Sequence, residues 1–288
     1  MAIPEEQIRA TERRYAERTS VREDLLRKID LGSVLEVDSP SRVLERVARL
    51  SRTPAIAAAL ARAIILADAS APYTSGDRAR TLLENVLTGN GLLPVNYLEK
   101  ALNACRPVGR VHAETRNQAV SAPNTGFLIS PRVLLTSFHL LANPGDAVSS
   151  AVEFDYQLGT DDEPVRSCRF GLEPEGFLLS NERLDYCLIA VREYSQCGIA
   201  LHSFGWHKLI PEGTAILGEF LNIVQHPEGS YKQLALRENQ IVDVLPDFLH
   251  YRTETAHGCS GAPVFNDQWE LVGLHHSGVP RRDAHGQI

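Results

Sequence analysis

The sequence lacks the features of a membrane or secreted protein. It has no run of about 18 or more apolar residues, so no segment is expected to span a membrane. Its first residues, MAIPEEQIRATERRYAERTS, are charged from residue 5 onward and contain no apolar core of a secretory signal. The five cysteines are an odd number at irregular spacing, which does not fit a disulfide framework. We therefore expect reduced thiols and a cytoplasmic location.

The sequence also lacks a surplus of basic residues. Lys and Arg number 29 against 36 Asp and Glu, which gives a formal net charge of −7. A surface that binds phosphates needs positive charge, so we expect no nucleic-acid partner for this segment. The composition, 43% hydrophobic and 23% charged, is ordinary for a globular protein, and 288 residues are enough for two domains.

Residues 1–106 are predicted to be helical. Thr53 followed by Pro54 is a typical helix start, and Ser75 can cap a second helix that stops at a Gly-Asn-Gly sequence. The charges of the first segment are expected to face solvent. Four helices are expected, at Glu5–Ile29, Ala55–Ala69, Ser75–Leu87 and Leu93–Ala104.

From residue 107 onward, short runs of β-branched and aromatic residues alternate with clusters of Gly, Pro, Asn and Asp. This spacing is typical of an all-β barrel or sandwich. We therefore predict an α+β multidomain chain, with an N-terminal α-helical domain (1–106) followed by an all-β domain (107–288). Strands are expected at Gly126–Ile129, Val133–Thr136, Ala151–Tyr156, Tyr186–Val191, Phe220–Val224, Gln240–Val244, Pro263–Phe265 and Leu271–Leu274.

The strongest chemical signal is the sequence GCSGAPVF at residues 258–265. A serine between glycines on a tight loop suits an exposed nucleophile. The glycines let the backbone turn so that amide N–H groups converge, and we expect the N–H groups of Gly258 and Ser260 to form an oxyanion hole. Taken alone, the motif also fits an ordinary turn before a strand.

A serine nucleophile needs a base and a group that orients the base. His139 follows the second strand of a predicted hairpin, and Asp185 stands at the head of an apolar strand. A buried carboxylate there is costly unless it is paired, and a hydrogen bond from an imidazole N–H would offset that cost. The chain order His139, Asp185, Ser260 is that of a chymotrypsin-type triad. These residues are the predicted base, orienting acid and nucleophile.

With these motifs the sequence resembles the trypsin-like serine peptidases, and among them the bacterial glutamyl endopeptidases. The resemblance covers roughly residues 108–280. It implies two six-stranded antiparallel barrels with the active site between them, and peptide-bond hydrolysis without a metal or an organic cofactor. It is carried by Thr125–Ile129, Leu134–His139, Asp185 with its strand, Asn222–Gly229, Gly258–Asn266 and Leu271–Gly278.

The resemblance also implies a pocket for P1, the substrate residue before the scissile bond. His275 and Thr255 stand where glutamyl endopeptidases keep residues that contact an acidic P1 side chain. Both side chains can donate hydrogen bonds to a carboxylate. Glu254 stands six residues before the serine, where trypsin keeps the acid that binds Arg or Lys. An acidic P1 is expected, and a basic P1 stays open.

Two departures from the family and one further resemblance bear on how the chain is regulated and organised. Cys259 replaces the aspartate of the usual zymogen switch, so we expect restraint through the helical domain and an upstream activator. Only ten residues follow Gly278, which predicts a truncated domain. The segment Asn90–Leu98 resembles bacterial antiphage-defence proteins that fuse such a peptidase to a nuclease or effector, which implies a C-terminal nuclease domain in a longer chain.

The sequence therefore predicts a regulated serine endopeptidase that acts on specific protein partners in an antiviral defence pathway. Two alternatives stay open. One is a catalytically silent, peptidase-like binding module, and the other is an active peptidase with a basic P1 preference. An esterase using the same three residues is less favoured, because barrels of this type are mostly peptidases.

Overall fold

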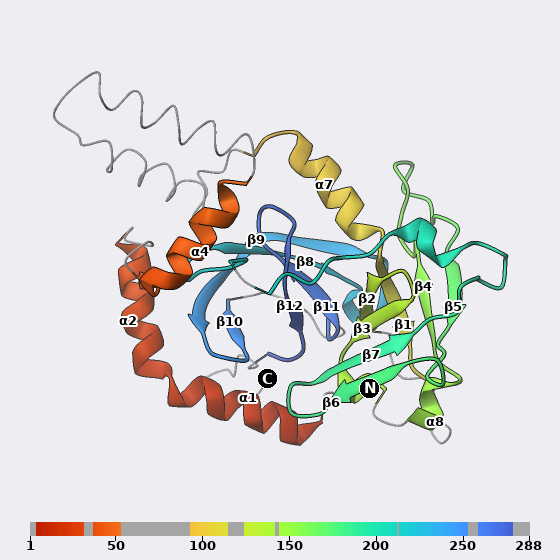
Figure 1. The fold of residues 1–288 in the computed structure, drawn as a ribbon, viewed down its shortest axis with the longest axis horizontal. Helices are drawn as coiled ribbons and strands as arrows, with labels where there is room; N and C mark the ends of the chain where they lie inside the picture. Colours follow the sequence, from red (N-terminus) through yellow and green to blue (C-terminus); the bar gives the residue numbers. More distant parts are fainter. Residues whose placement is uncertain are drawn as a thin grey trace.

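The computed structural model of the chain describes residues 4–31, 37–52, 93–114, 124–141, 144–211, 213–252 and 259–278. Helices at the N-terminus are followed by two curled antiparallel sheets (Figure 1). This arrangement confirms the predicted fold class, a helical N-terminal part followed by a chymotrypsin-like double β-barrel. The boundary at residues 106 and 107 stays a prediction.

The predicted helix Glu5–Ile29 is present as two helices divided at Arg18, and Leu93–Ala104 corresponds to the helix that leads into the first strand. The helix at residues 40–50 was not predicted, although Ser39 caps it by accepting a hydrogen bond from the Arg42 N–H. The predicted helices at 55–69 and 75–87 lie outside the described residues. The helices are α1 (Glu5–Glu17), α2 (Thr19–Asp30), α4 (Pro40–Leu50), α7 (Asn96–Cys105) and α8 (Pro144–Ala147), with 3-10 turns η1 (Phe138–Leu140), η2 (Leu201–Phe204) and η3 (Pro227–Gly229).

The first sheet contains seven strands in the order β5-β4-β1-β2-β3-β7-β6. An isolated bridge between Leu172 and Val191 joins the continuations of β5 and β7, which curls the sheet toward closure. Its interior is filled by fully buried apolar side chains such as Leu134, Phe154 and Ile189. The strands are β1 (Val108–His112), β2 (Asn124–Ser130), β3 (Val133–Thr136), β4 (Ala151–Phe154), β5 (Cys168–Gly171), β6 (Leu178–Asn181) and β7 (Tyr186–Ala190).

The second sheet contains five strands in the order β10-β9-β8-β11-β12, around buried Leu221, Ile223, Ile241 and Val264. The resemblance implied six strands in each barrel, whereas the described residues form seven and five. All eight predicted strands are present, and β1, β5, β6 and β10 are additional. The strands are β8 (Phe220–Gln225), β9 (Gln233–Val244), β10 (Leu249–Tyr251), β11 (Ala262–Phe265) and β12 (Leu271–His275).

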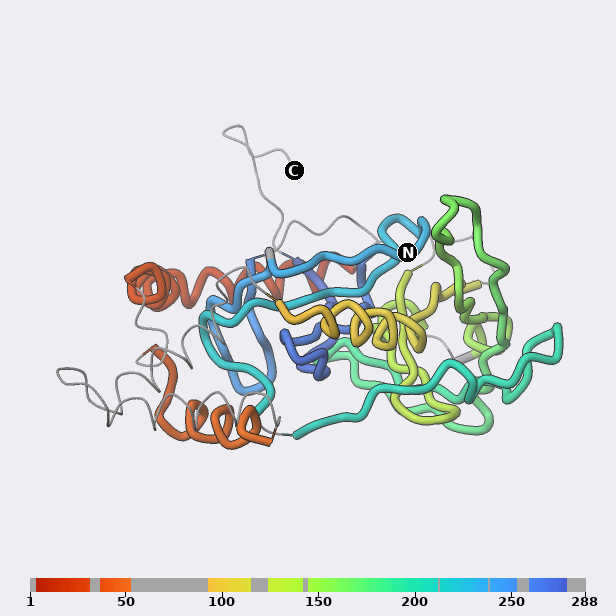
Figure 2. Tube along the Cα trace, turned by 90° about the horizontal axis from the view of Figure 1, so that it is seen from above, coloured from red at the N-terminus to blue at the C-terminus, as the bar shows by residue number. Residues whose placement is uncertain are grey.

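Helix α7 lies over the junction of the two sheets, as the yellow helix of Figure 2 shows. Its buried Tyr97 packs in one cluster with Phe127 of the first sheet and with Phe265 and Trp269 of the second. The Thr125 N–H of β2 also donates to the Ser260 carbonyl. These contacts fix the two sheets against each other, and the bond between Thr125 and Ser260 does so at a predicted site residue.

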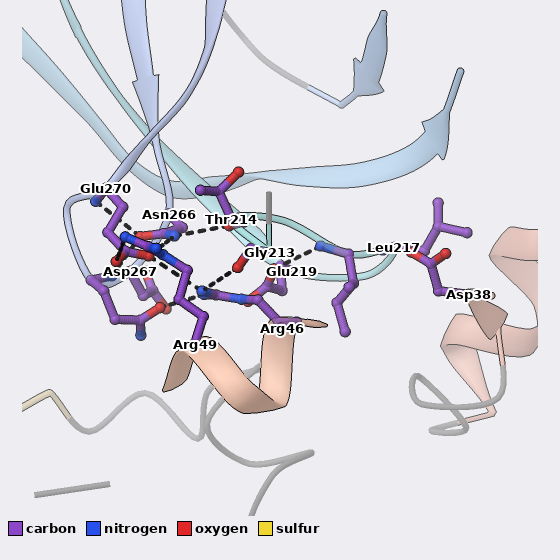
Figure 3. A network of polar contacts seen from close by, with 12 residues as sticks. Asp38, Arg46, Arg49, Gly213, Thr214, Leu217, Glu219, Asn266, Asp267 and Glu270 are labelled. Carbon is purple, nitrogen blue, oxygen red and sulfur yellow. Dashed lines mark hydrogen bonds and ion pairs between the residues drawn. The ribbon is translucent and has the colours of Figure 1, made fainter. Parts of the chain in front are cut away.

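Helix α4 is bound to the second sheet by buried charges (Figure 3). The Arg46 guanidinium, 1% exposed, lies 2.8 Å from the Glu219 carboxylate and also contacts Gln268 and Glu270. Burial raises the pKa of Glu219, and the neighbouring Arg46 opposes that rise. A buried carboxylate of this kind is tolerated only with a paired cation, so Arg46 ties α4 to the barrel.

The expectation of a solvent-facing charged surface on the first helices was wrong in part. Arg18 makes a two-pronged ion pair with buried Asp243 of β9, with bonds of 2.6 and 2.8 Å, and Arg22 is buried. The weak apolar pattern of this segment has a physical reason, because polar groups share its contacts with the barrel, beside the apolar contact of Leu25. Within the described residues, no helix is both long enough and apolar enough to cross a bilayer.

Candidate active site

His139 and Asp185 are brought into direct contact by neighbouring strands. His139 lies in η1 just after β3, Asp185 lies just before β7, and β3 pairs with β7 through Thr136 and Cys187. The His139 Nδ1 lies 3.0 Å from Asp185 Oδ1 and 2.9 Å from Oδ2. The His139 backbone N–H donates to the same Oδ1 at 3.0 Å. Both residues are buried.

The surroundings of Asp185 favour its charged form. Burial alone opposes ionisation, but the hydrogen bonds from His139, together with the nearby His276 ring, outweigh it and hold the pKa of Asp185 well below its usual range. Asp185 also adopts a left-handed backbone conformation, with φ of 53°. Its N–H donates to the Glu182 carbonyl at 3.2 Å, which closes the turn into β7. Such a conformation costs about 1 kcal/mol or more in a non-glycine residue and is concentrated at functional sites.

Ser260 stands on a tight turn before β11 that is fixed to both sheets. Its carbonyl accepts from Thr125 of β2, and the next N–H, that of Gly261, donates to the His275 carbonyl at 2.7 Å. Gly261 has φ of +84°, and an added Cβ would collide with the Thr125 carbonyl and lie 2.5 Å from the Thr136 hydroxyl. Only glycine fits this position, which explains the glycine that follows the serine in the motif.

The hydroxyl of Ser260 reaches the other two residues through His276. Ser260 Oγ donates to the His276 carbonyl at 3.1 Å, and His276 Nδ1 lies 3.5 Å from Asp185 Oδ2. Within the part of the chain that the structure describes, the outer nitrogen of His139, Nε2, has no hydrogen-bond partner. The structure thus joins His139 to Asp185 directly and links Ser260 to Asp185 through His276, whose carbonyl accepts the Ser260 hydroxyl.

His276 was missed as a site residue because its contact with Ser260 uses a backbone carbonyl, which leaves no mark in the sequence. Tyr251 was missed as well. Its hydroxyl lies 2.6 Å from Nδ1 of buried His275. Burial, with a smaller contribution from His276, lowers the pKa of His275 to about 4, so its ring is neutral at pH 7. Tyr251 and His276 line a cavity of about 700 Å³ between the sheets.

The other predicted site residues, Gly258, Thr255 and Glu254, lie outside the described residues. None of the five cysteines, all of which lie in the described ranges, forms a disulfide, and Cys259 is buried. In the described ranges no three His, Cys, Asp or Glu side chains gather in a way that could hold a metal ion.

Known proteins of two bacteria illustrate what the chain is similar to. The uncharacterized protein y4fB of Sinorhizobium fredii is 39% identical over 212 residues, which are 70% of this chain and 32% of that protein. The chain therefore spans about a third of the length of this curated relative. A serine endoprotease of Yersinia pestis has a solved structure that is similar with a TM-score of 0.44 and 15% identity, over 64% of this chain and 58% of that one.

Residues 124–274 match the family model described as a trypsin-like peptidase domain. The matched range includes Ser260 and the contact between His139 and Asp185, and it covers more than half of the chain. The chain belongs to the trypsin-like peptidases, and these residues form its serine peptidase domain.

Proposed function

We propose that the chain is an active serine endopeptidase in which Ser260 attacks the peptide carbonyl, His139 takes its proton and Asp185 orients His139. The observation that carries this proposal is the double attachment of Asp185 to the ring and backbone of His139. An ionised carboxylate on Nδ1 keeps the proton on that nitrogen, so that Nε2 is free to accept the proton of Ser260.

The reaction needs one rearrangement of Ser260. Its hydroxyl donates to the His276 carbonyl, while His139 Nε2 has no partner in the described residues. A rotation of the Ser260 side chain that moves its hydrogen bond from the His276 carbonyl to His139 Nε2 would activate the nucleophile. The N–H of Ser260, with that of Gly258, would then bind the oxyanion. His139 afterwards returns the proton to the leaving amine.

The substrate is proposed to carry Glu or Asp at P1. His275 is neutral and buried, and Tyr251 is the natural donor to its Nδ1 because burial raises the pKa of the tyrosine hydroxyl and keeps it protonated. Nε2 then carries the remaining proton of the ring and can donate it to a carboxylate. A basic P1 remains the alternative, and it would require the carboxylate of Glu254 in the pocket.

A second candidate function is a binding module without activity. The observation that favours it is the Ser260 hydroxyl bonded to His276 instead of His139. In that reading the cleft recognises a protein and cuts nothing.

The wider context is proposed from the sequence resemblance. The chain would act in the cytoplasm on specific protein partners within an antiviral defence pathway. The helical part would receive an upstream activator, and a nuclease domain would belong to a longer chain.

A peptide library tests this function. We expect the wild-type chain to cleave after Glu or Asp, and Ser260→Ala and His139→Ala to cleave nothing. Cleavage only after Arg or Lys would contradict the P1 assignment. Binding of library peptides without any cleavage by the wild type would favour the binding module.

A further inference from the structure

Helix α1 lies along the edge of the second sheet where β12 ends, below β10 and β12 in Figure 1. Its only buried residue, Thr11, has its hydroxyl 2.7 Å from the hydroxyl of Ser277. Ser277 follows His276, whose carbonyl accepts the hydroxyl of Ser260. Helix α1 therefore borders the segment after β12, which begins at His276, the residue whose carbonyl is hydrogen-bonded to the proposed nucleophile Ser260.

This segment is suited to hold an extended peptide. β12 is an edge strand of its sheet, and residues 276–278 continue it without a regular partner strand in the described residues. Peptides add to such edges as an extra strand, through backbone hydrogen bonds. A substrate with its P1 residue at His275 would continue along Ser277, with the preceding substrate residues passing α1.

Arg14 is the cation of α1 that faces this edge. Its guanidinium carbon lies 3.9 Å from the centre of the Phe248 ring, and its Nη2 donates to Thr11 at 2.9 Å. The Phe248 ring lies 5.6 Å from the His276 ring, and both line the cavity between the sheets. Arg14 thus contacts Phe248, which lines this cavity beside His276.

The charge of Arg14 lacks a counter-ion within the described residues. Its Nε is buried without an acceptor, and burial lowers the pKa of the guanidinium with no opposing carboxylate. Arg18, one turn later, shows the contrast, because it forms a two-pronged pair with Asp243. A partly buried cation is costly without an anion, and a carboxylate from a ligand would remove that cost. A guanidinium stacked on a ring still presents its edge to a carboxylate.

We propose that Arg14 is a specificity-determining residue that binds an acidic side chain of the substrate on the N-terminal side of P1. This inference rests on the proposed function, since it assumes that the cleft receives a peptide. The substrate class is a peptide with an acidic residue at one of positions P2 to P4, in addition to the residue at P1.

Binding is measured first, without catalysis. Fluorescent peptides that carry Glu or Gln at P2, P3 or P4 are titrated into the full chain with Ser260→Ala, and anisotropy gives the dissociation constants. We expect about tenfold tighter binding of the Glu peptide at one position, as one charge-assisted hydrogen-bonded pair provides. Arg14→Gln should abolish this difference, and Arg14→Lys should retain part of it.

Arg13→Gln is the matched control, because Arg13 is the preceding residue of the same helix and is exposed. It should keep the preference for Glu. Thermal unfolding checks that each variant is folded. Equal binding of Glu and Gln peptides at all three positions would overturn the proposal, and so would an unchanged preference in Arg14→Gln.

Kinetic measurements on the active chain then distinguish a specificity role of Arg14 from a role in which α1 merely covers the edge of the sheet. The ratio of kcat/KM for Glu over Gln peptides should fall about tenfold in Arg14→Gln. An equal rise of kcat/KM for both peptides would instead mean that α1 covers the edge, and would overturn the proposal. Fluorophosphonate labelling of Ser260 in the wild type reports the proposed function separately. A wild type that does not label, combined with a preference for Glu in the binding assay on the Ser260→Ala chain, would contradict only the peptidase activity.

Discussion

The carboxylate of Asp185 binds two different groups of one residue, the ring Nδ1–H and the backbone N–H of His139. The backbone bond fixes the carboxylate, and the carboxylate then fixes the ring. This relationship determines which ring nitrogen holds a proton, and it leaves Nε2 as the acceptor that a serine nucleophile requires.

Replacement of Asp185 by Asn tests this relationship. The amide is uncharged, so it would stabilise the protonated imidazole less and could leave the proton on the wrong ring nitrogen. We expect kcat to fall by about a thousandfold to ten-thousandfold. Asp161→Asn is the control, because Asp161 is exposed in the loop between β4 and β5. A fall of less than tenfold in Asp185→Asn would contradict the assigned role.

The free energy of unfolding should depend on pH through the carboxylate of Asp185. The pKa of Asp185 is held below its usual value, so near pH 4 the unfolded chain binds more protons than the folded one. The stabilisation by this group is complete above about pH 4 and is lost as the pH falls further toward the folded pKa.

Urea unfolding at pH 7 and pH 3 measures this dependence. Asp185→Asn should lose less free energy of unfolding between the two values than the wild type. Glu153, whose pKa is lowered to about 2 by its hydrogen bonds against the effect of burial, adds acid sensitivity to both proteins equally. Identical losses in the two proteins would contradict the prediction.

Gly261→Ala should disrupt the nucleophile turn. The added methyl group would collide with the Thr125 carbonyl in a backbone conformation that alanine avoids. We expect loss of soluble folded protein, or a large fall in the urea midpoint together with loss of activity. Gly205→Ala is matched, since Gly205 has φ of +73° but open space around it. It should cost about 1 kcal/mol. Equal effects of the two substitutions would show that the contact with Thr125 is unimportant.

Tyr251→Phe should weaken the preference for an acidic P1. Without the hydroxyl, either nitrogen of His275 can hold the proton, and the donor to the substrate carboxylate is no longer fixed. We expect kcat/KM for a P1 Glu peptide to fall about tenfold relative to the matching P1 Gln peptide. His275→Ala should give the same selective loss. A uniform loss on both peptides would assign Tyr251 and His275 to packing.

The sequence predicts most of the barrel and the contact between His139 and Asp185. β3 and β7 are short apolar runs with clear boundaries, and each predicted residue stands at a strand end, so their pairing follows from the fold. Tyr251 could not be found in this way, because its strand has three residues, too few to show a period, and all three are half-buried. The contact of Thr11 with Ser277 joins polar residues 266 positions apart, and no periodic pattern records it.

The central claim, that Ser260 is an activated nucleophile, is tested most directly by covalent labelling. The full wild-type chain is treated with a fluorophosphonate probe at pH 7.5, and the adduct is located by mass spectrometry. The account predicts one adduct on Ser260, none in Ser260→Ala, and slow labelling in His139→Ala. An unlabelled wild type, or an adduct on another serine, would contradict it.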